Sequence, residues 1–421
     1  MKRLFVIILV LFPVLYFYAQ QDSKLLKLQD CYASAEENYP LSKKRELIAK
    51  SSAFTIGNIA KGYYPKIDIN AQATYQSDVT KLPISLPGID VPTLNKDQYK
   101  AYGEVNQVIY DGGNIKQQKE IVTSQSKVQQ QQLAVDLYAV KQRVTDIYFG
   151  ILIYEEQLAQ NALLKNDISI GMKTVEAQLK NGTAYRSSLD LLKAEYLKAD
   201  QQAISIRSYK KAYLDMLGLF MNQELSSDTK LETPQTIISI QEINRPELAL
   251  FKFRDESIEI NKESINAGNR PKLNFFVQGG IANPALNFLQ EGFEWYYVGG
   301  LRLNWSLTGL YTSKKQKEII DINKLEVEAD KETFLFNTKQ SLKQQNAEIS
   351  KLQEYLVSDG EIVNLRANVK KASLAQLENG VINTNDYLKN VNDENEAKQN
   401  KIIHETELLL AQYRQKLITG N

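Results

Sequence analysis

An internal repeat constrains the fold of this 421-residue chain more than any other sequence feature. Residues 106–121, NQVIYDGGNIKQQKEI, match residues 304–319, NWSLTGLYTSKKQKEI, at an offset of 198. Residues 177–182, AQLKNG, match residues 375–380, AQLENG, at the same offset. Two ungapped matches that share one offset predict two halves of equivalent structure.

Each half is predicted to contain a lead helix, two strands, a very long helix, a short break and another long helix. We place the halves at 21–243 and 244–421. The first half carries 8 extra residues within 78–97, a stretch with three of the ten prolines, which predicts an exposed loop. The expected elements are lead helices at 25–61 and 246–267, strands at about 64–77, 98–110, 271–283 and 295–307, and later helices at 113–180, 187–221 and 385–418.

The four strand segments alternate apolar and polar side chains. The alternation is strict from Lys66 to Gln76, and it returns at 273–281 and 301–307. The second strand is less regular, because Val108 falls on its polar face. Such strands fit a membrane barrel with one face toward lipid, and they also fit a half-buried soluble sheet.

Aromatic side chains near the strand ends favour the barrel, because such residues gather at membrane interfaces. Ordinary core aromatics remain the alternative. The candidate interface residues are Tyr64, Tyr75, Tyr102, Trp295, Tyr297 and Trp305. Four strands cannot close a barrel, since the smallest has about 8, and open edges are not viable in lipid. We therefore expect several copies to share one barrel, and three copies would supply 12 strands.

The predicted helices are too long for an ordinary globular domain. From Gly113 to Lys180 there is no proline, and the only interior glycines are Gly150 and Gly171. These residues would span roughly 100 Å as one helix, whereas a globular helix averages about 11–12 residues. Such length predicts a coiled coil or a helical tube, and the sparse apolar positions favour a solvated wall over a packed core. The Asn-Gly pairs at 181–182 and 379–380 predict tight helical hairpins.

The N-terminus predicts a secretory signal peptide over residues 1–20. Lys2 and Arg3 precede an apolar run from Leu4 to Tyr18, and polar residues follow Ala19. An uncleaved anchor helix is the alternative, although a membrane span needs about 20 residues. A lipidated cysteine would directly follow the apolar run, and Cys31 lies well beyond it, so we expect a buried structural thiol.

The composition excludes several kinds of function. Lys plus Arg (51) balance Asp plus Glu (50), so no overall field recruits nucleic acid. A single cysteine and a single histidine exclude a Cys/His zinc site within one chain. His404 lies on a predicted helix among Glu405, Thr406 and Glu407, and we interpret it as a solvated side chain. We expect no enzyme activity, no catalytic residue, no metal and no cofactor.

The sequence resembles the TolC-type outer-membrane efflux protein family. The resemblance is carried by the signal peptide, the doubled helix–strand–strand–helix unit, YDGGNIKQQKE at 110–120, RPEL at 245–248 and the two Asn-Gly hairpin tips. It implies a mainly α-helical chain that forms a homotrimer, with a 12-stranded transmembrane β-barrel on a long periplasmic coiled-coil tunnel. The implied location is the outer membrane of a Gram-negative bacterium, with a large periplasmic part.

The resemblance also implies a role and partners. The role is a passive exit duct of a tripartite efflux or type I secretion system, and the partners are a periplasmic adaptor, an inner-membrane pump of RND or ABC type and outer-membrane lipid. The alternatives are a secreted coiled-coil structural protein and a periplasmic adaptor. An adaptor would need a glycine-rich, lipoyl-like β domain beside a single hairpin.

The residues implied for contact with the adaptor and closure of the tunnel are Asn181, Gly182, Thr183, Asn379, Gly380 and Val381. Asp386 matches the acidic residue that the family places at the channel entrance. Lys389 stands where a second acid occurs in the family, which departs from the pattern. An ordinary alternative exists for Asp386, because an acid near a helix N-terminus is favourable by about 0.3–1 kcal/mol.

Overall fold

The structure is a computed structural model that describes residues 25–80, 93–237, 242–288, 290 and 292–421. The predicted signal peptide lies outside the described residues, as does most of the predicted loop at 78–97. None of the helices in the described part is both long and apolar enough to span a membrane.

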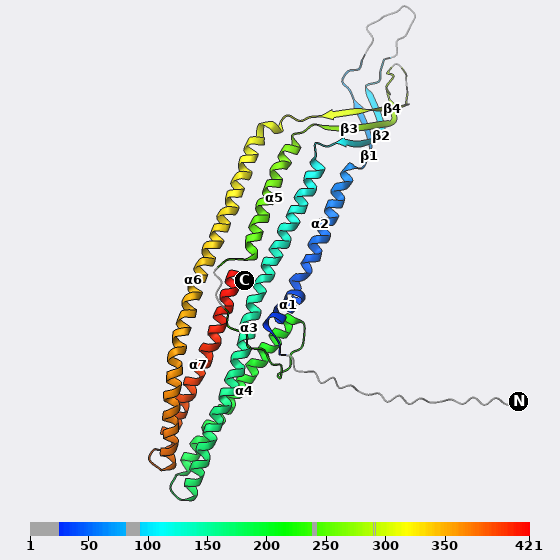
Figure 1. The fold of residues 1–421 in the computed structure, drawn as a ribbon. Helices are drawn as coiled ribbons and strands as arrows, with labels where there is room; N and C mark the ends of the chain where they lie inside the picture. The colour runs from blue at the N-terminus through cyan, green and yellow to red at the C-terminus, as the bar shows by residue number, and fades with distance from the viewer. Residues whose placement is uncertain (1–24, 81–92, 238–241, 289, 291) are drawn as a thin grey trace, which may run out of the picture. The chain divides into compact units, whose positions relative to one another are not determined.

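The order of elements is the same in both halves (Figure 1): two strands, a helix of about 70 residues and a helix of 36 residues. The first half contains α1 (Leu28–Asn38), α2 (Lys44–Ala60), β1 (Lys66–Tyr75), β2 (Asp97–Tyr110), α3 (Asn114–Lys180) and α4 (Arg186–Met221). The second half contains α5 (Pro246–Gly268), β3 (Lys272–Asn283), β4 (Glu294–Asn304), α6 (Gly309–Glu378) and α7 (Thr384–Thr419). Apart from α1 and α2, and from α6, for which no bounds were predicted, these bounds fall within a few residues of the predicted ones.

The first lead helix is the main departure from the predicted elements. Instead of one helix over 25–61, the chain forms α1, a short 3-10 turn at Pro40–Lys43, and α2. Proline has no backbone N–H to donate and disfavours helical geometry in the residue before it. Tyr39 is accordingly extended, with φ −61° and ψ 131°. Pro40 therefore ends α1.

The chain divides into two compact units, and each takes segments from both sequence halves. What we call the tip unit contains the described residues of 25–38, 143–237 and 349–413, and what we call the sheet unit contains those of 39–142, 242–348 and 414–421. The helices α3, α6 and α7 run from one unit into the other. The two units therefore do not correspond to the two sequence halves. The strands of both halves belong to the sheet unit, and the hairpin tips of both halves belong to the tip unit.

All four strands form one antiparallel sheet in the order β1-β2-β3-β4. Strand β2 pairs with β3, which joins the two halves of the sequence along one ladder, and β1 and β4 are the outer strands. The register shifts between Val108 and Tyr110, and this irregularity follows the residue that interrupted the predicted alternation. Figure 1 shows the sheet following α2 and α5 in the sheet unit.

Helix α3 buries a continuous apolar stripe, which corrects the predicted solvated wall. The buried positions alternate in spacings of four and three, the repeat of a coiled-coil seam. They are Leu133, Leu137, Val140, Val144, Ile147 and Ile151. From 133 to 140 only one narrow face of the helix is buried. From 144 to 152 the buried surface is wider, because Thr145, Tyr148 and Phe149 are buried as well.

Candidate functional site

The two hairpin tips of the tip unit have the same backbone geometry. Gly182 has φ 74°, and its N–H donates to the Leu179 carbonyl while Thr183 N–H donates to the Gln178 carbonyl at 2.9 Å. This pair of bonds is the Schellman motif that ends a helix on a left-handed glycine. The second tip repeats it at the equivalent place in the second half, with φ 70° at Gly380.

The bonds of the second tip run from Gly380 N–H to the Leu377 carbonyl and from Val381 N–H to the Gln376 carbonyl at 2.8 Å. Asn181, Thr183, Asn379 and Val381 are all exposed. A side-chain bond links the two tips, because Gln178 Nε2 donates to the Leu377 carbonyl at 2.6 Å. The six tip residues identified from the sequence therefore lie together on one exposed end of the tip unit.

Asp386 and Lys389 lie in the first turns of α7, immediately after the second tip. Both are exposed, and Asn383 Oδ1 caps the helix by accepting a hydrogen bond from Asp386 N–H at 3.0 Å. Asp386 therefore adds a negative charge beside a helix N-terminus that a side chain already caps. Across the described residues, no ion pair joins Asp386 to Lys389.

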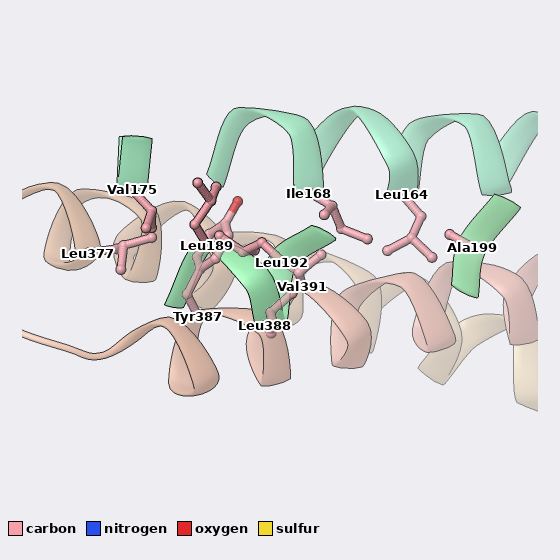
Figure 2. Packing of buried hydrophobic residues seen from close by; sticks show 10 residues of the cluster. All are labelled: Leu164, Ile168, Val175, Leu189, Leu192, Ala199, Leu377, Tyr387, Leu388 and Val391. Carbon is pink, nitrogen blue, oxygen red and sulfur yellow. The ribbon is translucent and has the colours of Figure 1, made fainter. Parts of the chain in front are cut away.

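Behind the tips, one apolar cluster joins all four long helices of the tip unit. Figure 2 shows side chains from α3, α4, α6 and α7 converging on it. Its members are Leu164, Ile168, Val175, Leu189, Leu192, Ala199, Leu377, Tyr387, Leu388 and Val391. Tyr387 is 1 % exposed, and its hydroxyl donates to the Asp167 carbonyl at 3.1 Å. Burial raises the pKa of Tyr387 to about 12, so its hydroxyl stays protonated at neutral pH.

A charged network in the same unit ties α7 and α6 to α3. Lys370 Nζ lies 2.8 Å from Asp167 Oδ2 and 3.2 Å from Glu394 Oε2. Lys398 pairs with the other oxygen of Glu394, a residue that is only 2 % exposed. Burial lowers the pKa of Lys370, but the hydrogen bond and charge of Asp167, with the charge of Glu394, raise it overall. Sequence analysis did not identify this network, since its members come from three helices that lie far apart in the sequence.

The sheet unit has two unlike faces. Odd-numbered residues of β1 form an exposed apolar face: Ile69 is 90 % exposed and Tyr75 is 77 % exposed. The same face continues on β4, where Trp295 and Tyr297 are each 81 % exposed. The even-numbered face carries Lys, Asp, Glu, Asn and Gln side chains. Residues that alternate along a strand point to opposite faces, so this division follows from the predicted period of two.

The six predicted interface aromatics separate into groups. Tyr75, Trp295 and Tyr297 lie on the apolar face, whereas Tyr64 and Trp305 lie just outside β1 and β4 and are more than half exposed. Trp305 Nε1 donates to the Asn269 carbonyl at 3.0 Å. Tyr102 differs from the other five, because it lies on the polar face, where its ring is 4.6 Å from the Lys100 ammonium.

The side chains of Cys31 and His404 both pack against other parts of the tip unit. Cys31 is fully buried in α1, as predicted, and burial raises the pKa of its thiol to about 12. The prediction of a solvated His404 is wrong: its Nδ1 lies 2.7 Å from Asp359 Oδ2 of α6, and its ring packs on Tyr355. The partner lies on another helix, so spacing within α7 could not identify it. Within the described residues, no His, Cys, Asp and Glu side chains group to hold a metal ion.

No family model matches the sequence, and no curated protein matches it either. Solved structures do match its fold. The outer-membrane channel OprN superposes with a TM-score of 0.65 at 14 % identity, over 93 % of this chain and 90 % of that one. The MtrE outer membrane channel of Neisseria gonorrhoeae gives 0.64 at 14 % identity, over 93 % and 89 %.

The outer membrane protein VceC of Vibrio cholerae gives a TM-score of 0.63 at 11 % identity, over 92 % of this chain and 95 % of that one. The chain therefore has, over nearly its whole length, the fold of outer-membrane channels of the TolC type. The resemblance predicted from the repeat and the hairpin tips is confirmed at the level of the fold.

Proposed function

We propose that this protein is the outer-membrane exit duct of a tripartite efflux or type I secretion system in a Gram-negative bacterium. It conducts solutes or proteins passively, and an inner-membrane pump of RND or ABC type supplies the driving force. The fold shared with OprN, MtrE and VceC supports a channel. The observation that carries the proposal lies in the sheet.

The sheet combines an exposed apolar face with two unpaired edges. Side chains such as Ile69 and Trp295 expose more than four-fifths of their surface. Strands β1 and β4 each have a neighbour on one side only within the described residues. In water this surface would favour aggregation, and in lipid an unpaired backbone edge costs several kcal/mol for each unsatisfied group.

Association of three copies removes both problems. The β1 edge of one copy pairs with the β4 edge of the next, which closes a 12-stranded barrel and leaves no free edge. The apolar faces then contact outer-membrane lipid and the polar faces line a water-filled interior. Tyr75, Trp295 and Tyr297 belong to the lipid side, with Tyr64 and Trp305 at the strand ends. We place Tyr102 on the water side instead.

The helical end of the homotrimer faces the periplasm and meets the adaptor. Each copy contributes two Schellman tips with exposed residues, Asn181 to Thr183 and Asn379 to Val381. Three copies would present six equivalent tips to one adaptor. The exposed Asp386 then forms a ring of three carboxylates near the entrance, which attracts cations.

Two measurements test this function. The mature protein should require detergent for extraction and migrate as a trimer in unheated gels. Single channels in planar bilayers should prefer cations, and Asp386→Ala should weaken that preference because three carboxylates are lost. Lys389→Ala is the matched control: it removes the opposite charge one turn away, so it should strengthen the preference.

A monomer that stays soluble without detergent would contradict the duct and favour a secreted coiled-coil structural protein. Absence of conductance in wild type and in both variants would contradict it as well. The adaptor alternative is weakened by the element order, because the chain has two long helical hairpins rather than one.

A further inference from the structure

The polar face of the sheet holds a lysine between two aromatic rings. Lys100 lies near the start of β2, and its ammonium is 4.6 Å from the ring centroid of Tyr102 and 5.2 Å from that of Tyr296. Tyr296 is only 8 % exposed although the sheet face is open, and its hydroxyl accepts a hydrogen bond from Gln278 Nε2 at 2.9 Å. The ammonium therefore has a defined position above two packed rings.

A glycine between the two tyrosines makes this arrangement possible. Gly280 is the cross-strand neighbour of Tyr102 on one side and of Tyr296 on the other. A Cβ atom at Gly280 would lie 2.6 Å from the Cβ of Tyr102, closer than real side chains approach. Because Gly280 has no side chain, the rings of Tyr102 and Tyr296 can both pack close to the sheet. Each ring then presents a face to the Lys100 ammonium.

A second cation on the same face is neutralised, whereas Lys100 is not. Arg302 lies 4.4 Å from the Phe276 ring centroid, but its Nη1 is also 3.7 Å from the Glu104 carboxylate. No carboxylate in the described part of the chain lies within ion-pair distance of Lys100. Aromatic rings hold a cation without cancelling its net charge, so Lys100 presents a full positive charge to solvent.

We propose that Lys100 is an anion-attracting residue of the pore, held by Tyr102 and Tyr296 and specific for solutes that carry a carboxylate, sulfonate or phosphate group. The inference rests on the proposed function, in which the polar face lines the barrel interior. Three copies would place three such ammonium groups around one pore, where low-dielectric walls strengthen their field. The duct then contains two rings of opposite charge: the Asp386 carboxylates near the helical tips and the Lys100 ammonium groups in the barrel.

The test measures ion selectivity and block in planar bilayers, with the trimeric protein in an Asp386→Ala background so that the entrance ring does not mask the barrel. Reversal potentials in a KCl gradient give the chloride-to-potassium permeability ratio. Lys100→Gln should lower this ratio by at least about twofold, and Lys100→Glu should lower it further. Lys100→Arg should keep it. The conductance block by naphthalene trisulfonate, added to either side, should weaken in the same order.

The matched control is Lys96→Gln, which removes an exposed lysine just before β2 that lies over none of the described rings. It should change selectivity less than Lys100→Gln. The role of the rings is tested with Tyr296→Leu, which removes one π face, and Tyr296→Phe, which keeps it. Tyr296→Leu should reduce the anion preference, and Tyr296→Phe should preserve it.

The outcomes separate this inference from the duct itself. If no variant conducts at all, the proposed function fails. If the channel conducts but Lys100→Gln leaves the permeability ratio and the block unchanged, or acts no more strongly than Lys96→Gln, the inference is overturned while the duct stands. Equal effects of Tyr296→Leu and Tyr296→Phe would remove the role of the rings.

Discussion

At the scale of single residues, the two interior glycines of α3 explain how tyrosines enter the helical packing. A Cβ at Gly171 would lie 2.5 Å from Cε1 of the buried Tyr387 ring, and one at Gly150 would lie 2.6 Å from Cδ1 of Tyr213. Glycine weakens a helix interior by roughly 0.5–1 kcal/mol relative to alanine. Here it allows α7 and α4 to approach α3 closely enough for each ring to pack against the backbone.

We therefore expect Gly171→Ala to destabilise the protein. The gain in helix propensity, about 1 kcal/mol, is outweighed by overpacking, which typically costs about 1–3 kcal/mol because a buried ring cannot move aside. Gly360→Ala is the matched control: it lies in α6 with nothing within 4 Å, so it should stabilise. Thermal unfolding in detergent, followed by circular dichroism, measures both. A Gly171→Ala protein as stable as the Gly360→Ala variant would contradict the packing argument.

At the scale of elements, the sequence predicted where α3 and α6 end, at the two hairpin tips. It did not predict which side chains of these helices contact other helices. The Asn-Gly pairs marked both helix ends, since a left-handed residue is needed there and glycine adopts it without steric cost. The charged network of Lys370 arises only when three helices pack together. Its residues are an ordinary lysine and ordinary acids among many along these helices.

Replacement of Lys370 should lower the free energy of unfolding, because it breaks this charged network. Lys370→Met leaves Asp167 without a partner and Glu394 with one, so we expect a loss of about 2–3 kcal/mol, less than the roughly 3–5 of a fully buried pair because 20 % of the Lys370 side chain is exposed. Lys173→Met, at an exposed lysine of α3, is the control and should be near neutral.

A double-mutant cycle with Glu394→Gln identifies the coupling. Denaturant unfolding of the two single variants and the double variant should give a double-variant loss smaller than the sum, because the second change removes a charge already left without a full set of partners. Strict additivity of the two losses would show that Lys370 acts through its packing alone.

At the scale of the whole molecule, the proposed trimer depends on the two outer strands of the sheet, which have no second neighbour within the described residues. Its two outer strands come from opposite halves of the sequence, β1 from the first and β4 from the second. A sheet that begins with one half and ends with the other can be extended by an identical sheet. The repeat therefore predicts a ring rather than a two-fold dimer.

Cysteines placed on the two edges should report this pairing. A chain with Asn70→Cys on β1 and one cysteine scanned along 296–302 of β4 should form covalent dimers and trimers upon oxidation, and nothing larger. The native thiol does not interfere, because Cys31 is fully buried and its pKa is raised to about 12. The control pair, Glu104→Cys with Gln278→Cys, joins register partners within one chain and should remain monomeric. A ladder beyond the trimer would contradict ring closure.

The sequence alone determined the features that depend on local patterns: four strands with alternating side chains, helices without breakers, tips at Asn-Gly and two matches that share the offset of 198. These features can be predicted because each one depends on a pattern that is visible directly along the sequence. The broken lead helix at Pro40 also carried a local signal that the helical pattern obscured.

Only the tertiary structure decided which ordinary residues matter together. His404 contacts Asp359, and Lys370 pairs with Asp167 and Glu394. Lys100 lies over the rings of Tyr102 and of Tyr296, which belongs to the other half of the sequence. These contacts join different strands or helices, so no spacing within one element encodes them. The burial of a side chain also depends on the tertiary structure. A lysine or tyrosine on an open face of an element is exposed, whereas one on a packed face contacts other side chains.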